Sequence, residues 1–235
     1  MRLIITRPRE DADALKVTLE RLGHSVILSP LLEIVPIDSV VPDEQYQVIA
    51  LTSANAPRVM SRRGGLAKIR GLPVLAVGLQ SAEAARAAGF TNVQIAGGDA
   101  AGLAKHIRET HDSGAGPVLY LSGRDSAADF TGKLESAGFA VRRVIAYEAK
   151  PAAKLAPDVH SNADAVLLFS PRTARIWGGL VAREGLDAAA RTQMHVCISS
   201  NTAAALPEHY PRRIATRPTE AAMLDVIAGL ISRPR

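Results

Sequence analysis

Leu3-Ile4-Ile5-Thr6-Arg7 is a short apolar run that ends in a small polar residue and an arginine. The same pattern returns near the middle of the chain as Val118-Leu119-Tyr120-Leu121-Ser122-Gly123-Arg124. Each run is followed by a pattern with helical spacing, then by a glycine and a further strand-like run. The two stretches therefore mark the starts of two similar halves, each built from strands that alternate with helices.

Strand-like and helical patterns alternate through both halves. In the first half Leu15, Leu19 and Leu22 recur at helical spacing, and Gly23 ends the helix. Strands are expected at 3–5, 25–28, 48–51, 74–77, 93–95, 118–121, 141–147, 165–169 and 195–198. Several of these runs are apolar at every position, as strands are when helices cover both faces of a parallel sheet. The sequence thus predicts an α/β fold made of duplicated, doubly wound parallel-sheet units.

Two extended segments occupy equivalent places in the halves and are interpreted as crossings between domains. One runs from Glu33 to Asp38 with Pro42 after it, and the other runs from Tyr147 to Pro151. Each joins a strand-like run to a proline-bearing stretch, where extended backbone is favoured over helix. Such crossings permit a layout in which each domain takes segments from both halves.

Composition narrows the classes of function. The chain of 235 residues is 47% hydrophobic and 22% charged, which is typical of a globular protein. Its one cysteine, Cys197, excludes an internal disulfide framework and fits a reducing compartment. No apolar run has the length of a signal-peptide core or of a spanning helix, so a cytoplasmic location is expected. The net charge of +5 favours anionic partners, while an aromatic content of 4% offers no base-stacking platform for nucleic acid.

The loops that follow the strands are rich in small and hydroxylated residues. In open parallel sheets, ligands bind beyond the carboxyl ends of the strands, where helix N-termini offer free backbone N–H groups. Any one of these loops is also explained by a helix N-cap, which requires only a Ser, Thr, Asp or Asn. Their repetition, with arginines in four of them, favours a site for a polyanion. The candidate binding residues are Thr6, Arg7, Ser53, Asn55, Gly78, Ser81, Ser122, Gly123, Arg124, Ser170, Arg172, Ser200 and Thr202.

Several other kinds of site are not supported by the sequence. The chain has no P-loop, no G-x-G-x-x-G dinucleotide fingerprint and no G-x-S-x-G elbow of a serine hydrolase. None of the six histidines pairs with a cysteine or another histidine at metal-ligand spacing, so no metal site is expected. Cys197 lies within a strand-like run and is expected to be a buried, unreactive thiol.

Tyr147 is singled out because it ends a β-branched run beside an expected domain crossing. Its phenol can donate a hydrogen bond or a proton to a bound ligand. A tyrosine that only caps a hydrophobic core is the alternative interpretation of the same position. Tyr147 is the candidate catalytic residue of the chain.

The strand ends also form an ordered series of short motifs that spans the whole chain. They are 3–8, 51–56, Ala76-Val77-Gly78 with Ser81-Ala82, 120–123, 144–148, 168–171, 202–206 and Pro218-Thr219. In this order they resemble the motifs of the uroporphyrinogen-III synthase family. There are two departures. The stretch 199–202 stands where a glycine followed by small or hydroxylated residues is common in the family, and Ser81 stands where threonine is frequent.

The resemblance implies a fold of two flavodoxin-like α/β domains joined by two extended strands. One domain would be discontinuous and comprise residues 1–35 and 150–235. The other would comprise residues 38–147, with the active-site cleft between the two domains. A monomer is expected, with at most a transient contact with the preceding enzyme of the pathway and with neither nucleic acid nor membrane as a partner.

The resemblance also implies an activity. The substrate would be hydroxymethylbilane, a linear tetrapyrrole with eight carboxylates. The enzyme would close it to uroporphyrinogen III in haem biosynthesis, with loss of water and inversion of the last pyrrole ring through a spiro intermediate, and without a cofactor or metal. Tyr147 matches the tyrosine implicated in departure of the hydroxyl, and Arg7, Arg124 and Arg172 are possible partners of the carboxylates.

Two other functions remain open at this point. One is a non-catalytic, two-lobed cytosolic binding protein for a small polyanionic ligand, because such proteins also have duplicated α/β lobes with crossing strands. The other is a nucleotide-dependent transferase of doubly wound fold, which the missing phosphate-binding fingerprints disfavour.

Overall fold

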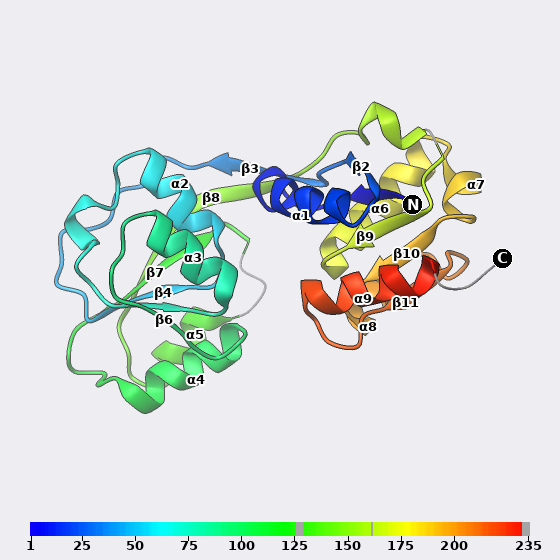
Figure 1. The fold of residues 1–235 in the computed structure, drawn as a ribbon. Coiled ribbons are helices and arrows are strands. Elements are labelled where there is room, and N and C mark those ends of the chain that lie inside the picture. The colour runs from blue at the N-terminus through cyan, green and yellow to red at the C-terminus, as the bar shows by residue number, and fades with distance from the viewer. Residues whose placement is uncertain (126–128, 161, 232–235) are drawn as a thin grey trace. The chain divides into compact units, whose positions relative to one another are not determined.

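The computed structural model describes residues 1–125, 129–160 and 162–231, and it has a mixed α/β architecture (Figure 1). The chain divides into two compact units. Unit 1 consists of Met1–Glu33 and Lys150–Arg235, and unit 2 consists of Ile34–Ala149. The prediction of two parallel-sheet α/β domains is confirmed. Among the described residues, no helix is long and apolar enough to cross a membrane.

Unit 1 is built on a five-stranded sheet with the order β11-β10-β9-β1-β2, in which every neighbouring pair is parallel. Its strands are β1 (Arg2–Ile5), β2 (Ser25–Leu28), β9 (Ala165–Leu168), β10 (Met194–Cys197) and β11 (Arg212–Ile214). Its helices are α1 (Arg9–Arg21), α6 (Pro171–Arg183), α7 (Asp187–Ala190), α8 (Ser200–Ala204) and α9 (Glu220–Ile231), with a 3-10 turn at Pro157–His160. Helices α1 and α9 pack on one face of the sheet, and α6, α7 and α8 pack on the other.

Unit 2 is built on a six-stranded sheet with the order β3-β8-β7-β4-β5-β6. Its strands are β3 (Leu32–Pro36), β4 (Val48–Leu51), β5 (Val74–Ala76), β6 (Val93–Ile95), β7 (Val118–Gly123) and β8 (Val141–Pro151). Its helices are α2 (Asn55–Arg62), α3 (Leu79–Ala87), α4 (Ala100–Thr110) and α5 (Phe130–Glu135), with a 3-10 turn at Ala67–Ile69. Helices α2 and α3 cover one face, and α4 and α5 cover the other.

The duplication in the sequence is distributed over both sheets. Unit 1 combines β1 and β2 from the first half with β9, β10 and β11 from the second, and the parallel part of unit 2 combines β7 and β8 with β4, β5 and β6. The two sheets have the same order when equivalent strands are matched, since β2-β1-β9-β10-β11 corresponds to β8-β7-β4-β5-β6. The chain passes between the units within β3 and β8, which are neighbours at the edge of the unit 2 sheet.

The core of unit 1 contains a buried histidine, His195, that is held as a neutral ring. Its Nε2 accepts a hydrogen bond from Trp177 Nε1 at 3.0 Å, and its Nδ1 lies 3.1 Å from the carbonyl oxygen of Pro211. A neutral imidazole with its proton on Nδ1 satisfies both partners. Burial lowers the pKa of His195 to about 4, because the charged ring would lose its hydration.

This histidine predicts a specific loss of stability in acid. The pKa of His195 is lower in the folded chain than the value of about 6.5 in the unfolded chain, so the unfolded state takes up the proton first as the pH falls. We expect His195 to account for a loss of about 2–3 kcal/mol in the free energy of unfolding between pH 7.5 and pH 4.5. Urea titrations of the wild type and of His195→Gln at the two pH values measure this loss, with His106→Gln as the control. Equal pH dependence in wild type and His195→Gln would contradict the assignment.

Candidate active site

Each sheet has a point where the chain reverses its direction of winding. In unit 2 the strands β4, β5 and β6 progress to one side and β7 and β8 to the other, so the reversal lies between β4 and β7. In unit 1 it lies between β1 and β9. Ligands of open α/β sheets bind outside the carboxyl ends of the strands at such points. The residues at these strand ends include Ser53 and Gly123 in unit 2, and Thr6 and Ser170 in unit 1.

Tyr147 is placed by an irregularity in the pairing of β7 with β8. Ser122 pairs with Ile145, but the next residue, Gly123, pairs with Tyr147, so Ala146 is an extra residue in β8. Ala146 and Tyr147 consequently both belong to the hydrophobic cluster beneath α2 and α3, although consecutive residues of a regular strand point to opposite faces. The β-bulge therefore turns Tyr147 toward the end of β4.

The hydroxyl of Tyr147 meets a second candidate residue there. Tyr147 Oη donates a hydrogen bond to Ser53 Oγ at 3.0 Å, and Ser53 Oγ also accepts from the backbone N–H of Asn55 at 3.1 Å. Tyr147 is 8% exposed, while Ser53 and Asn55 are half-buried. The structure thus brings three of the candidate residues together at the carboxyl edge of the unit 2 sheet.

The ring of Tyr147 lies so close to Gly123 that a residue with a side chain would not fit at this position. A Cβ atom on Gly123 would lie 2.7 Å from Cζ and 3.0 Å from Oη of Tyr147. The backbone N–H of Arg124 then donates to the carbonyl oxygen of Tyr147 at 2.7 Å. The Arg124 side chain is exposed, and its Nε lies 3.9 Å from a carboxylate oxygen of Glu148.

Gly78 and Ser81 lie one strand further along the sheet, after β5. Gly78 is the N-cap residue of α3 in an extended conformation, and Ser81 is buried in the first turn of that helix. Gly78 has no side chain with which to cap this helix start.

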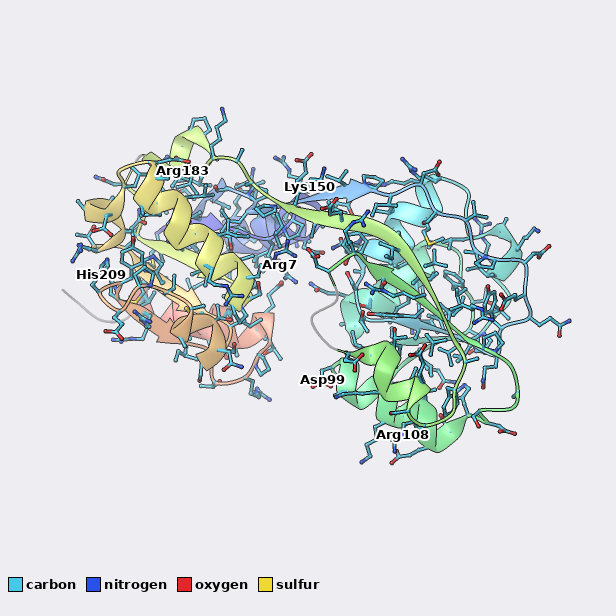
Figure 2. The ribbon with its side chains drawn as sticks, turned by 180° about the vertical axis from the view of Figure 1, so that it is seen from behind. Arg7, Asp99, Arg108, Lys150, Arg183 and His209 are labelled. Atoms are coloured by element: carbon cyan, nitrogen blue, oxygen red, sulfur yellow. The ribbon has the colours of Figure 1, made fainter. Side chains whose placement is uncertain are left out.

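In unit 1, Thr6 and Arg7 follow β1 directly at the reversal point. Thr6 Oγ1 donates to the carbonyl oxygen of Leu167 and so links β1 to β9. Arg7, labelled in Figure 2, pairs with Glu220 at 2.8 Å, and its guanidinium carbon lies 4.6 Å from the ring centroid of Phe169. These contacts from α9 and from the end of β9 hold the Arg7 side chain in a defined orientation.

The helix that follows β9 begins with a complete capping box. Ser170 Oγ accepts from the backbone N–H of Thr173, and Thr173 Oγ1 accepts from the backbone N–H of Ser170. Pro171 and the half-buried Arg172 follow in the first turn of α6. Ser170 is thus a helix cap, as the alternative interpretation of this loop proposed.

In the loop after β10, the residue that caps the next helix is Ser199. Ser199 caps α8, because its Oγ accepts from the backbone N–H of Thr202 and lies 3.0 Å from Thr202 Oγ1. Ser200, the residue named from the sequence, is exposed and is the first helical residue. The spacing of Ser199 and Thr202 repeats that of Ser170 and Thr173, and this shared pattern is the signal that could have identified Ser199.

Three candidate hydroxyls point to partners within the protein. Thr6, Ser122 and Thr202 are buried, and their hydroxyls bind the Leu167 carbonyl, Arg143 Nε and Ser199 Oγ respectively. Each of these three hydroxyls holds its own loop through a partner within the protein. Sequence reasoning also did not identify Arg143, Phe169 and Glu220, whose partners come from distant parts of the chain.

The histidines and the cysteine were considered in the sequence as possible metal ligands. Within the described ranges, no group of three or more His, Cys, Asp or Glu side chains is arranged to hold a metal ion. Cys197 is buried, and burial raises the pKa of its thiol to about 11. The prediction of an unreactive thiol at this position agrees with this environment.

A family model and solved structures that are similar to this chain all carry the name uroporphyrinogen-III synthase or synthetase. The family model described as uroporphyrinogen-III synthase HemD matches residues 13–225. The fold is similar to that of uroporphyrinogen-III synthetase from Helicobacter pylori, with a TM-score of 0.69, 17% identity and coverage of 98% of this chain and 100% of that one. It is also similar to a mutant uroporphyrinogen III synthase from Thermus thermophilus, with a TM-score of 0.54, 18% identity and coverage of 100% of both chains. No curated protein matches significantly. Because the family model covers most of its length, the chain belongs to the uroporphyrinogen-III synthase family.

Proposed function

We propose that this chain is a cyclising hydro-lyase that converts hydroxymethylbilane into uroporphyrinogen III. The observation that carries the proposal is the match of the family model to residues 13–225. The arrangement of Tyr147, Ser53 and Gly123 at the reversal point of the unit 2 sheet supports it, because ligands of such sheets bind there. A cytoplasmic location and a monomeric state remain predictions from the sequence.

Tyr147 is the proposed donor to the departing hydroxyl. When the C–O bond of the hydroxymethyl group breaks, the oxygen leaves as water and must gain a proton, which a positioned phenol can assist. Ser53 Oγ accepts from both Tyr147 Oη and the Asn55 N–H, so its own O–H proton remains for donation. The pair therefore offers two routes to the leaving oxygen, directly from Tyr147 or through Ser53.

Arginines and helix starts are the proposed binders of the substrate carboxylates. Arg7 is oriented by Glu220 and Phe169 and can exchange its partner carboxylate for one on the substrate. Arg124 is exposed, and the 3.9 Å separation from Glu148 makes that ion pair a weak competitor. The N-terminus of α6, which starts at Pro171 and carries Arg172, adds backbone N–H groups and the positive end of the helix dipole.

The buried hydroxyls support these groups indirectly. Thr6 joins β1 to β9 directly before Arg7, and Ser122 receives the Arg143 guanidinium directly before Gly123. They fix the loops from which the binding groups project. Inversion of the last ring requires the substrate ends to be held so that spiro closure is faster than direct end-to-end closure, and fixed loops serve that purpose.

The product of the reaction tests the proposal. The purified chain is mixed with freshly made hydroxymethylbilane, and the products are oxidised and separated by chromatography. We expect the type III isomer with the active chain and the type I isomer with heat-inactivated chain. Type I alone from the active chain would overturn the proposed function.

A further inference from the structure

Arg143 binds three consecutive residues at the end of β7. It lies on β8 opposite Tyr120. Its Nε donates to Ser122 Oγ at 2.9 Å, and its Nη2 lies 2.8 Å from the carbonyl oxygens of both Gly123 and Arg124. One guanidinium therefore fixes the strand end where Gly123 lies beneath the ring of Tyr147.

This strand end lacks regular pairing with β8, so the side-chain hydrogen bonds of Arg143 supply contacts that the ladder does not. The extra residue Ala146 interrupts the β7–β8 ladder between Ser122 and Gly123. Beyond the interruption, the backbone N–H of Arg124 donates to the Tyr147 carbonyl at 2.7 Å. Arg143 binds the carbonyls of Gly123 and Arg124 and so stabilises the peptide that anchors Tyr147.

Arg143 is also connected to the loop that carries Ser53. Its guanidinium carbon lies 6.0 Å from the ring centroid of Tyr120, within the range of a cation–π interaction. The hydroxyl of Tyr120 lies 2.9 Å from Thr52 Oγ1, the residue before Ser53. Arg143 thus binds the β7 end that pairs with Tyr147, and through Tyr120 it is linked to the loop that carries Ser53.

We propose that Arg143 is a positioning residue that holds the β7 end and, through it, the hydroxyl of Tyr147 in the geometry required for the reaction. The inference rests on the proposed function, because it gives Tyr147 its role in turnover. It adds a residue that the sequence shows only as one of a pair of adjacent arginines. The planar guanidinium suits the position, since it directs several N–H groups in fixed directions, whereas a lysine ammonium is a single flexible point charge.

Kinetics of Arg143→Met and Arg143→Lys test the proposal, with Arg142→Met as the matched control. Arg142 is the preceding residue of β8 and pairs with Glu44 at 3.0 Å on the surface. A misplacement of about 1 Å in an active site lowers turnover by about 10²-fold, so we expect a kcat loss of that order for Arg143→Met with KM little changed. Arg143→Lys should recover part of the loss, and Arg142→Met should retain wild-type kcat.

A double-mutant comparison separates positioning from direct contact with the substrate. If Arg143 acts through the Tyr147 hydroxyl, Arg143→Met lowers kcat strongly in the wild type but little in the Tyr147→Phe background. An equal fold-loss in both backgrounds, or a raised KM with unchanged kcat, would overturn the proposal and point to substrate binding by Arg143.

Amide hydrogen exchange supplies a readout that does not depend on activity. The Arg124 N–H donates to the Tyr147 carbonyl. Loss of the hydrogen bonds from Arg143 to the Gly123 and Arg124 carbonyls should therefore speed the exchange of this N–H in Arg143→Met and not in Arg142→Met. An unchanged exchange rate of the Arg124 N–H in Arg143→Met would contradict the proposal that Arg143 holds the β7 end. The product assay of the wild type decides the proposed function separately, so failure of one is distinguishable from failure of the other.

Discussion

Tyr147→Phe is expected to lower kcat by about 10²- to 10⁴-fold, the range contributed by a positioned proton donor. The phenylalanine ring occupies the same space above Gly123, but it has no hydroxyl to donate to Ser53 or to the leaving oxygen. The variant should remain folded, because losing one side-chain hydrogen bond costs only about 0.5–1.5 kcal/mol. Steady-state kinetics and urea unfolding of the same preparation measure the two effects.

Tyr210→Phe is the matched control for this substitution. Tyr210 is also buried, and its hydroxyl donates to Asp187 at 2.9 Å in unit 1, away from the reversal point between β1 and β9. The control also loses the hydrogen bond of a buried tyrosine hydroxyl, here one to a carboxylate, and should keep wild-type kcat. If Tyr147→Phe also keeps wild-type kcat, Tyr147 does not assist departure of the hydroxyl.

Gly123→Ala is expected to lower kcat by about 10²-fold through displacement of the tyrosine, although the chemistry of Tyr147 is untouched. The added Cβ would lie 2.7 Å from Cζ and 2.9 Å from Cε2 of Tyr147, so the ring or the strand end must move. Overpacking of this kind costs about 1–3 kcal/mol of stability, which unfolding titrations should detect.

Gly71→Ala is the control for the glycine substitution, since a Cβ at Gly71 meets no atom within 4 Å. It should leave both kcat and stability close to those of the wild type. A second comparison uses the Tyr147→Phe background, where Gly123→Ala should have little further effect on kcat. Full activity of Gly123→Ala would show that the position of the Tyr147 ring is not critical.

The strands at the centres of the sheets could be predicted because burial determines their composition. Strands β4 and β9 are buried at every position, and both show continuous apolar runs in the sequence. The edge strand β11 contains Arg212 and Arg213 and is largely exposed, so no apolar pattern marks it. Strand β8 continues to Pro151 beyond the apolar run, because β3 pairs with it at the sheet edge.

The candidate site could be predicted only in part. Their places at strand ends predict Tyr147 and Ser53 as site residues, and in the structure their hydroxyls are joined by a hydrogen bond. The bulge at Ala146 could not be predicted, because regular alternation places Ala146 and Tyr147 on opposite faces and the register depends on tertiary packing. The contacts of Arg143 depend on that bulge, so its sequence position beside Arg142 indicates only a charged surface.

The isomer composition of the product tests the central claim most directly. Wild-type chain, Tyr147→Phe and a reaction without protein are compared at one concentration of hydroxymethylbilane. The account predicts mainly uroporphyrinogen III with the wild type and a larger share of type I with Tyr147→Phe, because slower catalysis lets uncatalysed closure compete. If the wild type gives the same isomer composition as the reaction without protein, the account is contradicted.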